Sequence, residues 1–251
     1  MKIACTVGHS LLKNGQTTSA NGVVNEYMWC KKFVPILVDT FKSQGVQADL
    51  IICPEKQFTK ATEEKPYKLG KINGKKYDLV IESHLNAFDG KAKGTEVLYY
   101  PSSSKGKDYA QRVNDKLDDI FVDRGIKSRQ DLYILRDTDC PAILIEYFFC
   151  DNKEDYAKAD TTEKMQLIAK KVVEGVLNKE IQVPRDQLYA VCVGAYNYQN
   201  AKAKDISVSF NVSFASKKAL FRSFYNKYAV GKYKSNMWKF DKNRHKATLN
   251  F

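Results

Sequence analysis

The sequence has no long apolar run, and its histidines and cysteines are few. No stretch of the 251-residue chain approaches the roughly 20 uncharged apolar residues that a membrane-spanning helix needs. Residues 1–10 hold one lysine but lack the apolar core of a signal peptide, so we expect no secretory signal. The six cysteines are widely scattered without a Cys-x-x-Cys pair, which excludes a disulfide framework and is typical of a protein made in a reducing cytoplasm.

Basic residues are unevenly distributed along the chain. Residues 185–251 hold 13 Lys and Arg but only three Asp and Glu, whereas residues 1–184 hold 28 basic and 26 acidic residues. The last 67 residues also contain 13 of the 30 aromatic residues. Such a shift in composition predicts a domain boundary. We expect a first domain over residues 1–180, a linker over 181–187 and a second domain over 188–251.

Short runs rich in Val and Ile alternate with amphipathic stretches in the first domain. Strands are predicted over residues 2–7, 50–53, 78–81, 97–100 and 142–145. Helices are predicted over residues 25–44, 105–124 and 161–178, and Pro35 should kink or split the first of them. Apolar strands alternating with helices are typical of a mainly parallel twisted sheet with helices on both faces, so the sequence predicts an α/β fold.

The second domain shows another pattern. Residues 206–214 alternate strictly between apolar and polar side chains, which predicts a half-buried strand. Further strands are predicted over 188–193 and 237–240. Helical spacing of apolar residues predicts a helix over 217–228, with Ser216 as its N-cap. A small α+β domain is the resulting prediction.

Polar residues at the carboxyl ends of the predicted strands are candidate site residues, because ligands of open α/β sheets bind there. His9 follows the first strand, His84 the third and Glu146 the fifth, and Glu26 stands at the start of the first helix. Two imidazoles and a carboxylate are the ligand set of catalytic zinc sites, and a further carboxylate can act as general base. A single strand-end histidine is usually an ordinary hydrogen-bonded residue, so the hypothesis depends on the joint placement.

Five ordered motifs carry a family resemblance over about residues 1–178. They are Gly8-His9, Val23-Val24-Asn25-Glu26, Ser83-His84-Leu85-Asn86-Ala87, Gly94-Thr95-Glu96-Val97-Leu98-Tyr99-Tyr100 and Ile145-Glu146-Tyr147-Phe148-Phe149. Together they resemble the zinc-dependent N-acetylmuramoyl-L-alanine amidases, in particular the amidase endolysins of clostridial bacteriophages. The resemblance implies that His9, Glu26 and His84 bind zinc and that Glu146 is the catalytic carboxylate.

The resemblance also implies a reaction and a cellular role. The expected reaction is hydrolysis of the amide between N-acetylmuramic acid and the L-alanine of the stem peptide, in the peptidoglycan of a Gram-positive, clostridial wall. The basic segment 188–251 would bind anionic wall polymers. Without a signal peptide, a phage endolysin made in the host cytoplasm and acting after membrane permeabilisation is favoured over a bacterial autolysin or a sporulation or germination amidase. A non-catalytic basic protein that binds wall or nucleic acid is the alternative from another class.

Other residues are weaker candidates. Asn86 could hydrogen-bond substrate, or it could simply form a turn. Glu82 and Glu96 could orient a metal ligand from behind, although a solvated or salt-bridged side chain is the favoured interpretation for both. A cysteine nucleophile is disfavoured, because Cys5 and Cys150 both lie within apolar runs. His245, in the basic tail, is expected to be exposed and without metal.

Overall fold

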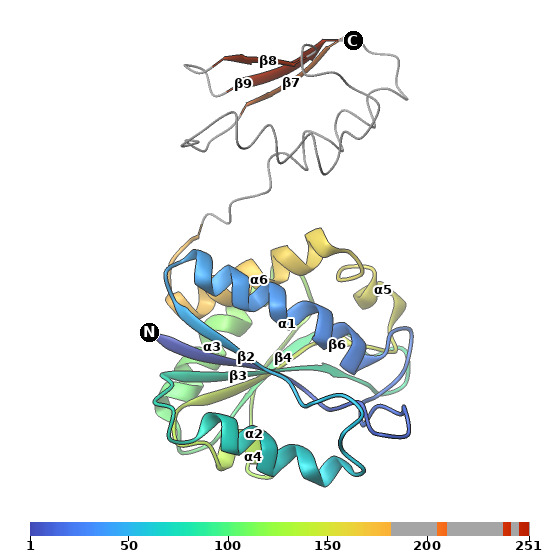
Figure 1. The fold of residues 1–251 in the computed structure, drawn as a ribbon, viewed down its shortest axis with the longest axis vertical. Coiled ribbons are helices and arrows are strands. Elements are labelled where there is room, and N and C mark those ends of the chain that lie inside the picture. The colour runs from blue at the N-terminus through green and yellow to red at the C-terminus, as the bar shows by residue number, and fades with distance from the viewer. Residues whose placement is uncertain (182–204, 210–237, 242–245, 251) are drawn as a thin grey trace. The chain divides into compact units, whose positions relative to one another are not determined.

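The computed structural model describes residues 1–181, 205–209, 238–241 and 246–250 (Figure 1). The chain separates into two compact units, Met1–Ile181 and Gln182–Phe251. Ile181 belongs to the first unit, because its side chain is buried and its backbone N–H donates to a carboxylate oxygen of Glu174. None of the helices in the described part of the chain is long and apolar enough to cross a membrane.

A six-stranded sheet forms the centre of the first unit, in the order β2-β1-β3-β6-β4-β5. Strands β2, β1, β3 and β6 are parallel to one another, whereas β4 runs antiparallel to β6 and β5 runs parallel to β4. The prediction of a mainly parallel sheet is therefore confirmed. The strands are β1 (Lys2–Val7), β2 (Gln47–Ile51), β3 (Leu79–Asn86), β4 (Thr95–Tyr99), β5 (Asp123–Ser128) and β6 (Ala142–Phe149).

Helices cover both faces of this sheet, as predicted (Figure 1). Three long helices lie on one face, and the last of them, α6, packs against the other two. Two shorter helices lie on the opposite face, where Ile72, Ile134 and Leu135 pack against the strand residues Val80 and Leu144. The helices of the first unit are α1 (Glu26–Ser43), the 3₁₀ helix η1 (Ala61–Glu63), α2 (Glu64–Ile72), α3 (Ser104–Leu117), α4 (Tyr133–Arg136), α5 (Lys153–Tyr156) and α6 (Thr162–Leu177).

Side-chain caps set the starts of the three long helices. Asn25, Ser103 and Thr161 each accept a hydrogen bond from a backbone N–H in the first turn of α1, α3 and α6, respectively. The sequence predicts that Pro35 kinks or splits this helix, and the split does not occur, because α1 runs through Pro35 without being divided. A helix can absorb one missing N–H when its apolar face is well packed, and Phe33, Val34 and Leu37 around this proline are all fully buried.

One helix is shorter than the sequence indicates, and one strand is missing from the prediction. Helix α3 ends at Leu117 instead of continuing to Arg124, and residues 123–128 form the edge strand β5. No residue of β5 is buried. An exposed edge strand of charged and small residues carries no apolar run from which it could be recognised.

The described part of the second unit is a three-stranded antiparallel sheet in the order β7-β9-β8. Strand β7 (Asp205–Ser209) overlaps the predicted strand 206–214 and begins one residue before it, and β8 (Trp238–Asp241) is displaced by one residue from the predicted strand 237–240. Strand β9 (Lys246–Asn250) was not predicted. The predicted strand 188–193, the predicted helix 217–228 and His245 lie outside the described residues.

Candidate metal centre

The four principal candidates meet at the carboxyl end of the parallel strands. His9 lies two residues after β1, and Glu26 is the first residue of α1. His84 and Glu146 lie within β3 and β6, because both strands extend beyond the predicted ends at residues 81 and 145. The apolar run ends where polar site residues begin, although the backbone continues to pair with the neighbouring strand.

His9, Glu26 and His84 form a compact cluster. Oε1 of Glu26 lies 3.0 Å from Nε2 of His9 and 2.9 Å from Nδ1 of His84. One potential ligand atom from each of the three residues lies within 4.8 Å of the others. The two imidazole rings meet edge to face, with centroids 4.7 Å apart. The structure thus brings together the three residues that the sequence predicts as metal ligands.

Backbone groups help to hold the cluster in place. The buried carboxylate of Glu26 accepts hydrogen bonds from the backbone N–H of Leu85 at 3.1 Å and from that of Ala20 at 3.1 Å. His9 adopts a positive φ of 64°, in the left-handed region that residues other than glycine rarely occupy. A Cβ atom on Gly8 would lie 2.6 Å from Cε1 of His84, so only glycine allows this close approach.

The electrostatics of the cluster stabilise positive charge between these side chains. Burial lowers the pKa of His84, but hydrogen bonds to Glu26 and Glu82 outweigh this effect and raise the pKa to about 10. Burial of Glu26 acts in the opposite direction to its two histidine contacts, which prevail and hold the pKa of Glu26 well below its usual range. A place where a carboxylate stays ionised between two imidazoles suits a cation.

Glu146 lies next to the cluster without joining it. Its Cα is the register partner of His84 across the parallel strands β3 and β6, so the two side chains project from the same face. Its Oε2 is buried and has no hydrogen-bond partner within the described part of the chain. Burial raises the pKa of Glu146 to about 7. An unpaired carboxylate whose pKa is near neutrality can both accept and release a proton.

Asn86 of β3 and Glu96 of β4 contact each other, and these two strands flank β6, which carries Glu146. Nδ2 of Asn86 donates to Oε1 of Glu96 at 3.0 Å, and Nε of Arg124 lies 3.3 Å from Oε2 of Glu96. Glu96 is therefore salt-bridged, as the favoured interpretation of the sequence has it. The backbone of Asn86 also accepts from the N–H of Cys150 at 2.7 Å, which joins the ends of β3 and β6.

Glu82 does contact a candidate ligand. Its Oε1 lies 2.9 Å from Nε2 of His84, and its Oε2 lies 3.2 Å from Nζ of Lys68 on α2. The sequence pattern places Glu82 and His84 on one face of β3, but it does not indicate Lys68. Helix α2 contains Pro66 and Gly70 and was not predicted, so nothing in the sequence signals that a lysine from it reaches this site.

The structure disfavours Cys5 and Cys150 as nucleophiles. Cys5 and Cys150 are fully buried, and burial raises the pKa of both thiols, that of Cys150 to about 12. A thiol with such a pKa is protonated at neutral pH and is a poor nucleophile.

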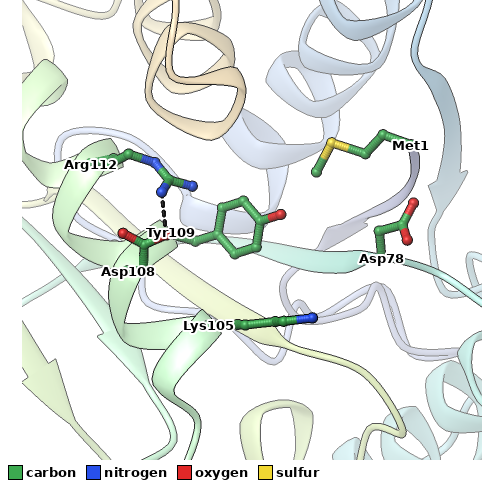
Figure 2. Close-up of a pocket in the computed structure, with 6 residues that line it drawn as sticks. All are labelled: Met1, Asp78, Lys105, Asp108, Tyr109 and Arg112. Atoms are coloured by element: carbon green, nitrogen blue, oxygen red, sulfur yellow. Dashed lines mark hydrogen bonds and ion pairs between the residues drawn. The ribbon is translucent and has the colours of Figure 1, made fainter.

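A depression of about 520 Å³ lies at the end of the sheet opposite the candidate metal centre (Figure 2). Met1 and Asp78, which immediately precede β1 and β3, form one side of it, and residues of α3 form the other. Asp108 of α3 pairs with Arg112 one turn later. None of the predicted site residues lines this depression, so it is separate from the metal centre.

Comparison with known proteins places the chain in a family. The family model for N-acetylmuramoyl-L-alanine amidase matches residues 3–178. The solved catalytic domain of CD27L endolysin, described as targeting Clostridia Difficile, is 56% identical, with a TM-score of 0.70 over 72% of this chain and 99% of that one.

Two curated proteins are similar over shorter segments. An uncharacterized cell wall amidase of Bacillus anthracis is 34% identical over 41% of this chain and 21% of its own length. The endolysin of Bacillus phage SPP1 is 33% identical over 42% of this chain and 41% of its own length. The chain thus spans less than half the length of these two relatives. Since the family model covers most of the chain and the solved domain is matched almost in full, the chain belongs to the N-acetylmuramoyl-L-alanine amidase family.

Proposed function

We propose that the protein is a zinc-dependent peptidoglycan hydrolase that cleaves the amide bond between N-acetylmuramic acid and the L-alanine of the stem peptide. The observation that carries this proposal is the cluster of His9, Glu26 and His84 beside a buried, unpartnered carboxylate oxygen of Glu146. Family membership supports the bond and the substrate class. The donor set supports the metal.

The residues present fit zinc. Two imidazoles and one carboxylate are a known ligand set of catalytic zinc sites, which keep a further position open for water. When bound, zinc lowers the pKa of a water molecule to about 7 and polarises the substrate carbonyl. Nε2 of His9, Nδ1 of His84 and a carboxylate oxygen of Glu26 are the atoms that converge, and we assign these as the ligands.

In this proposal Glu146 transfers protons. Its carboxylate takes a proton from the attacking water and delivers one to the departing amine of L-alanine. Its raised pKa suits both steps near neutral pH. Asn86, which lies two residues after His84 on β3 and donates to Glu96, would hydrogen-bond the substrate.

We infer an endolysin role from the relatives. Two of them are described as endolysins, one from a Bacillus phage and one targeting Clostridia Difficile. A protein of this kind would be made in the host cytoplasm and act on the wall after the membrane is permeabilised. The substrate would be the wall of a Gram-positive, clostridial host.

We further propose that residues 188–251 target the enzyme to the wall. This segment carries 12 Lys and Arg but only two Asp and Glu, which gives a strong positive field. Wall polymers rich in phosphate would be attracted to it. This basic segment belongs to the second unit, whereas all four principal site residues belong to the first unit.

Metal analysis combined with wall clearing tests the proposal. Purified protein should contain one zinc per chain, and a chelator should abolish clearing of a clostridial wall suspension. Added zinc should restore clearing. Full clearing by metal-free protein would refute the proposed mechanism.

A further inference from the structure

A buried row of polar side chains continues behind His84, on the side away from the other candidate ligands. Oε1 of Glu82 lies 2.9 Å from Nε2 of His84. Oε2 of Glu82 accepts from Oγ1 of Thr6 at 2.9 Å and from Nζ of Lys68 at 3.2 Å. The Lys68 side chain is 0% exposed, and that of Glu82 is 4% exposed. The row therefore runs from α2 through β1 and β3 to the metal centre.

Stability alone does not account for this ion pair. Removing Lys and Glu from water is costly, and well-packed apolar residues of similar size often stabilise a protein as well as a buried pair does. The apolar residues Val80, Leu144 and Ile72 form the core on the same face of the sheet. A charged pair that stands at the edge of this core and contacts a candidate ligand points to a role at the ligand.

We propose that Lys68, Glu82 and His84 form a relay in which Lys68 positions Glu82 and Glu82 keeps the proton of His84 on Nε2. This inference rests on the zinc-binding role of His84 in the proposed function. An ionised carboxylate can only accept a hydrogen bond, so the Nε2 that faces Glu82 must donate. Nδ1 lies 2.9 Å from Oε1 of Glu26, another candidate ligand, so a metal ion held by this cluster would take the place of the proton on Nδ1 and leave that on Nε2.

Lys68 and Thr6 fix the orientation of the Glu82 carboxylate. Both donate to the same oxygen of Glu82, so this carboxylate cannot rotate without losing two hydrogen bonds. His84 consequently meets the other oxygen. Within the described part of the chain, Lys68 contacts Glu82 but has no contact with Glu146 or with the ligand atoms that converge in the cluster. It is therefore a positioning residue.

The substitution Glu82→Gln tests whether Glu82 keeps the ring proton of His84 on Nε2. Lys68 can only donate, so it will attract the introduced amide oxygen and leave the amide NH₂ facing His84. That NH₂ group requires an unprotonated Nε2, which moves the ring proton to Nδ1, where it competes with zinc. We expect zinc affinity to fall 10- to 100-fold, the usual range for losing such a supporting contact.

A second substitution should reverse part of this loss. In the double variant Lys68→Met/Glu82→Gln, Thr6 can accept from the amide NH₂, and the amide oxygen is again available to Nε2 of His84. The double variant also leaves no unpaired buried charge, so it should fold even if a single variant does not. We expect its zinc affinity to be higher than that of Glu82→Gln alone. If the two substitutions instead caused independent structural defects, their losses of zinc affinity would add.

The experiment measures the zinc affinity of the full chain by competition with a chromophoric chelator. It compares the wild type, the single variants Glu82→Gln and Lys68→Met, and the double variant. Glu64→Gln is the matched control, because Glu64 is a buried carboxylate on α2 that binds Ser10 and Thr18 but has no contact with His84 in the described chain. It removes the same charge and should leave zinc affinity close to that of the wild type. Circular dichroism confirms folding of each variant.

Nitrogen NMR of the imidazole rings provides a readout that a structural role would not change. The chain has three histidines, so the His84 signals can be assigned by substitution. In zinc-loaded wild type, Nδ1 of His84 should be the coordinated nitrogen and Nε2 should carry the proton. Zinc on Nε2, unchanged affinity in Glu82→Gln, or a double variant no tighter than Glu82→Gln would each overturn the relay. A wild type that binds no zinc would instead refute the proposed function.

Discussion

His84 and Glu146 are register partners on the adjacent parallel strands β3 and β6. This relationship places a candidate metal ligand and a candidate base beside each other on one sheet face. Each belongs to a different motif of the sequence, 62 residues apart. The sheet therefore assembles the site through strand pairing.

Glu146→Gln should leave zinc bound while turnover falls at least about 100-fold, the scale of losing a general base. The amide has nearly the same size and shape, but it cannot take a proton from water. Zinc content and the rate of soluble muropeptide cleavage are the two measurements. A near-normal rate would show that Glu146 is not the base, and loss of zinc would show that it is a ligand.

His84→Ala should abolish both zinc binding and wall lysis. The change removes one of three ligands and also leaves Glu26 and Glu82 without a shared partner. Elemental analysis of the purified variant tests the assignment directly. One tightly held zinc per chain in this variant would mean that the metal lies elsewhere.

Gly8→Ala should weaken zinc binding and lower the melting temperature. The new Cβ would lie 2.6 Å from Cε1 of His84, and overpacking of this kind costs about 1–3 kcal/mol. In a domain of this size each 1 kcal/mol corresponds to roughly 2–4 °C. Calorimetry and the zinc competition assay measure both effects.

Gly70→Ala is the matched control for Gly8→Ala. Gly70 lies on α2, and a Cβ there would meet nothing within 4 Å. Alanine in a helix interior should stabilise the protein by about 0.5–1 kcal/mol relative to glycine. An equal loss of zinc affinity in both variants would contradict the steric explanation.

Truncation after Ile181 should preserve cleavage of soluble muropeptides and reduce lysis of intact cells. The first unit contains all four principal site residues and ends with the buried Ile181. Binding of full-length protein to purified walls should weaken with salt, because the Debye length falls from about 10 Å at 0.1 M to about 3 Å at 1 M. Equal lysis by truncated and full-length protein would contradict the targeting proposal. Tight binding of the isolated second unit to single-stranded nucleic acid but not to walls would favour the alternative.

The sequence predicted the strands and helices that carry an apolar run, an apolar periodicity or a capping residue. The Val- and Ile-rich core of β1 was placed with its observed bounds, and capped helices such as α6 were placed within a residue at each end. Edge strand β5 and helix α2 were missed, because the first is wholly unburied and the second contains proline and glycine. The stability of such elements comes from tertiary packing, which a single sequence does not display.

The candidate site was predictable to the extent that its residues have distinctive chemistry. His9, Glu26, His84 and Glu146 were identified from residue type, position and family motif, and the cluster of the first three is present. The contact between Glu82 and His84 follows from strand alternation. Lys68 could not be predicted, because the sequence contains many lysines and a lysine usually lies on the surface. Only the fold shows that this one is buried against Glu82.

Mass spectrometry of peptidoglycan digested by the full-length protein tests the proposed amidase activity, because it identifies the bond that is cut. We expect glycan strands with free lactyl carboxylates on muramic acid, together with stem peptides that begin with a new L-alanine amino group. Both products should disappear when zinc is removed and return when it is added back. Cleavage within the glycan or within the peptide stem, with the muramic acid–alanine amide intact, would refute the proposed amidase activity.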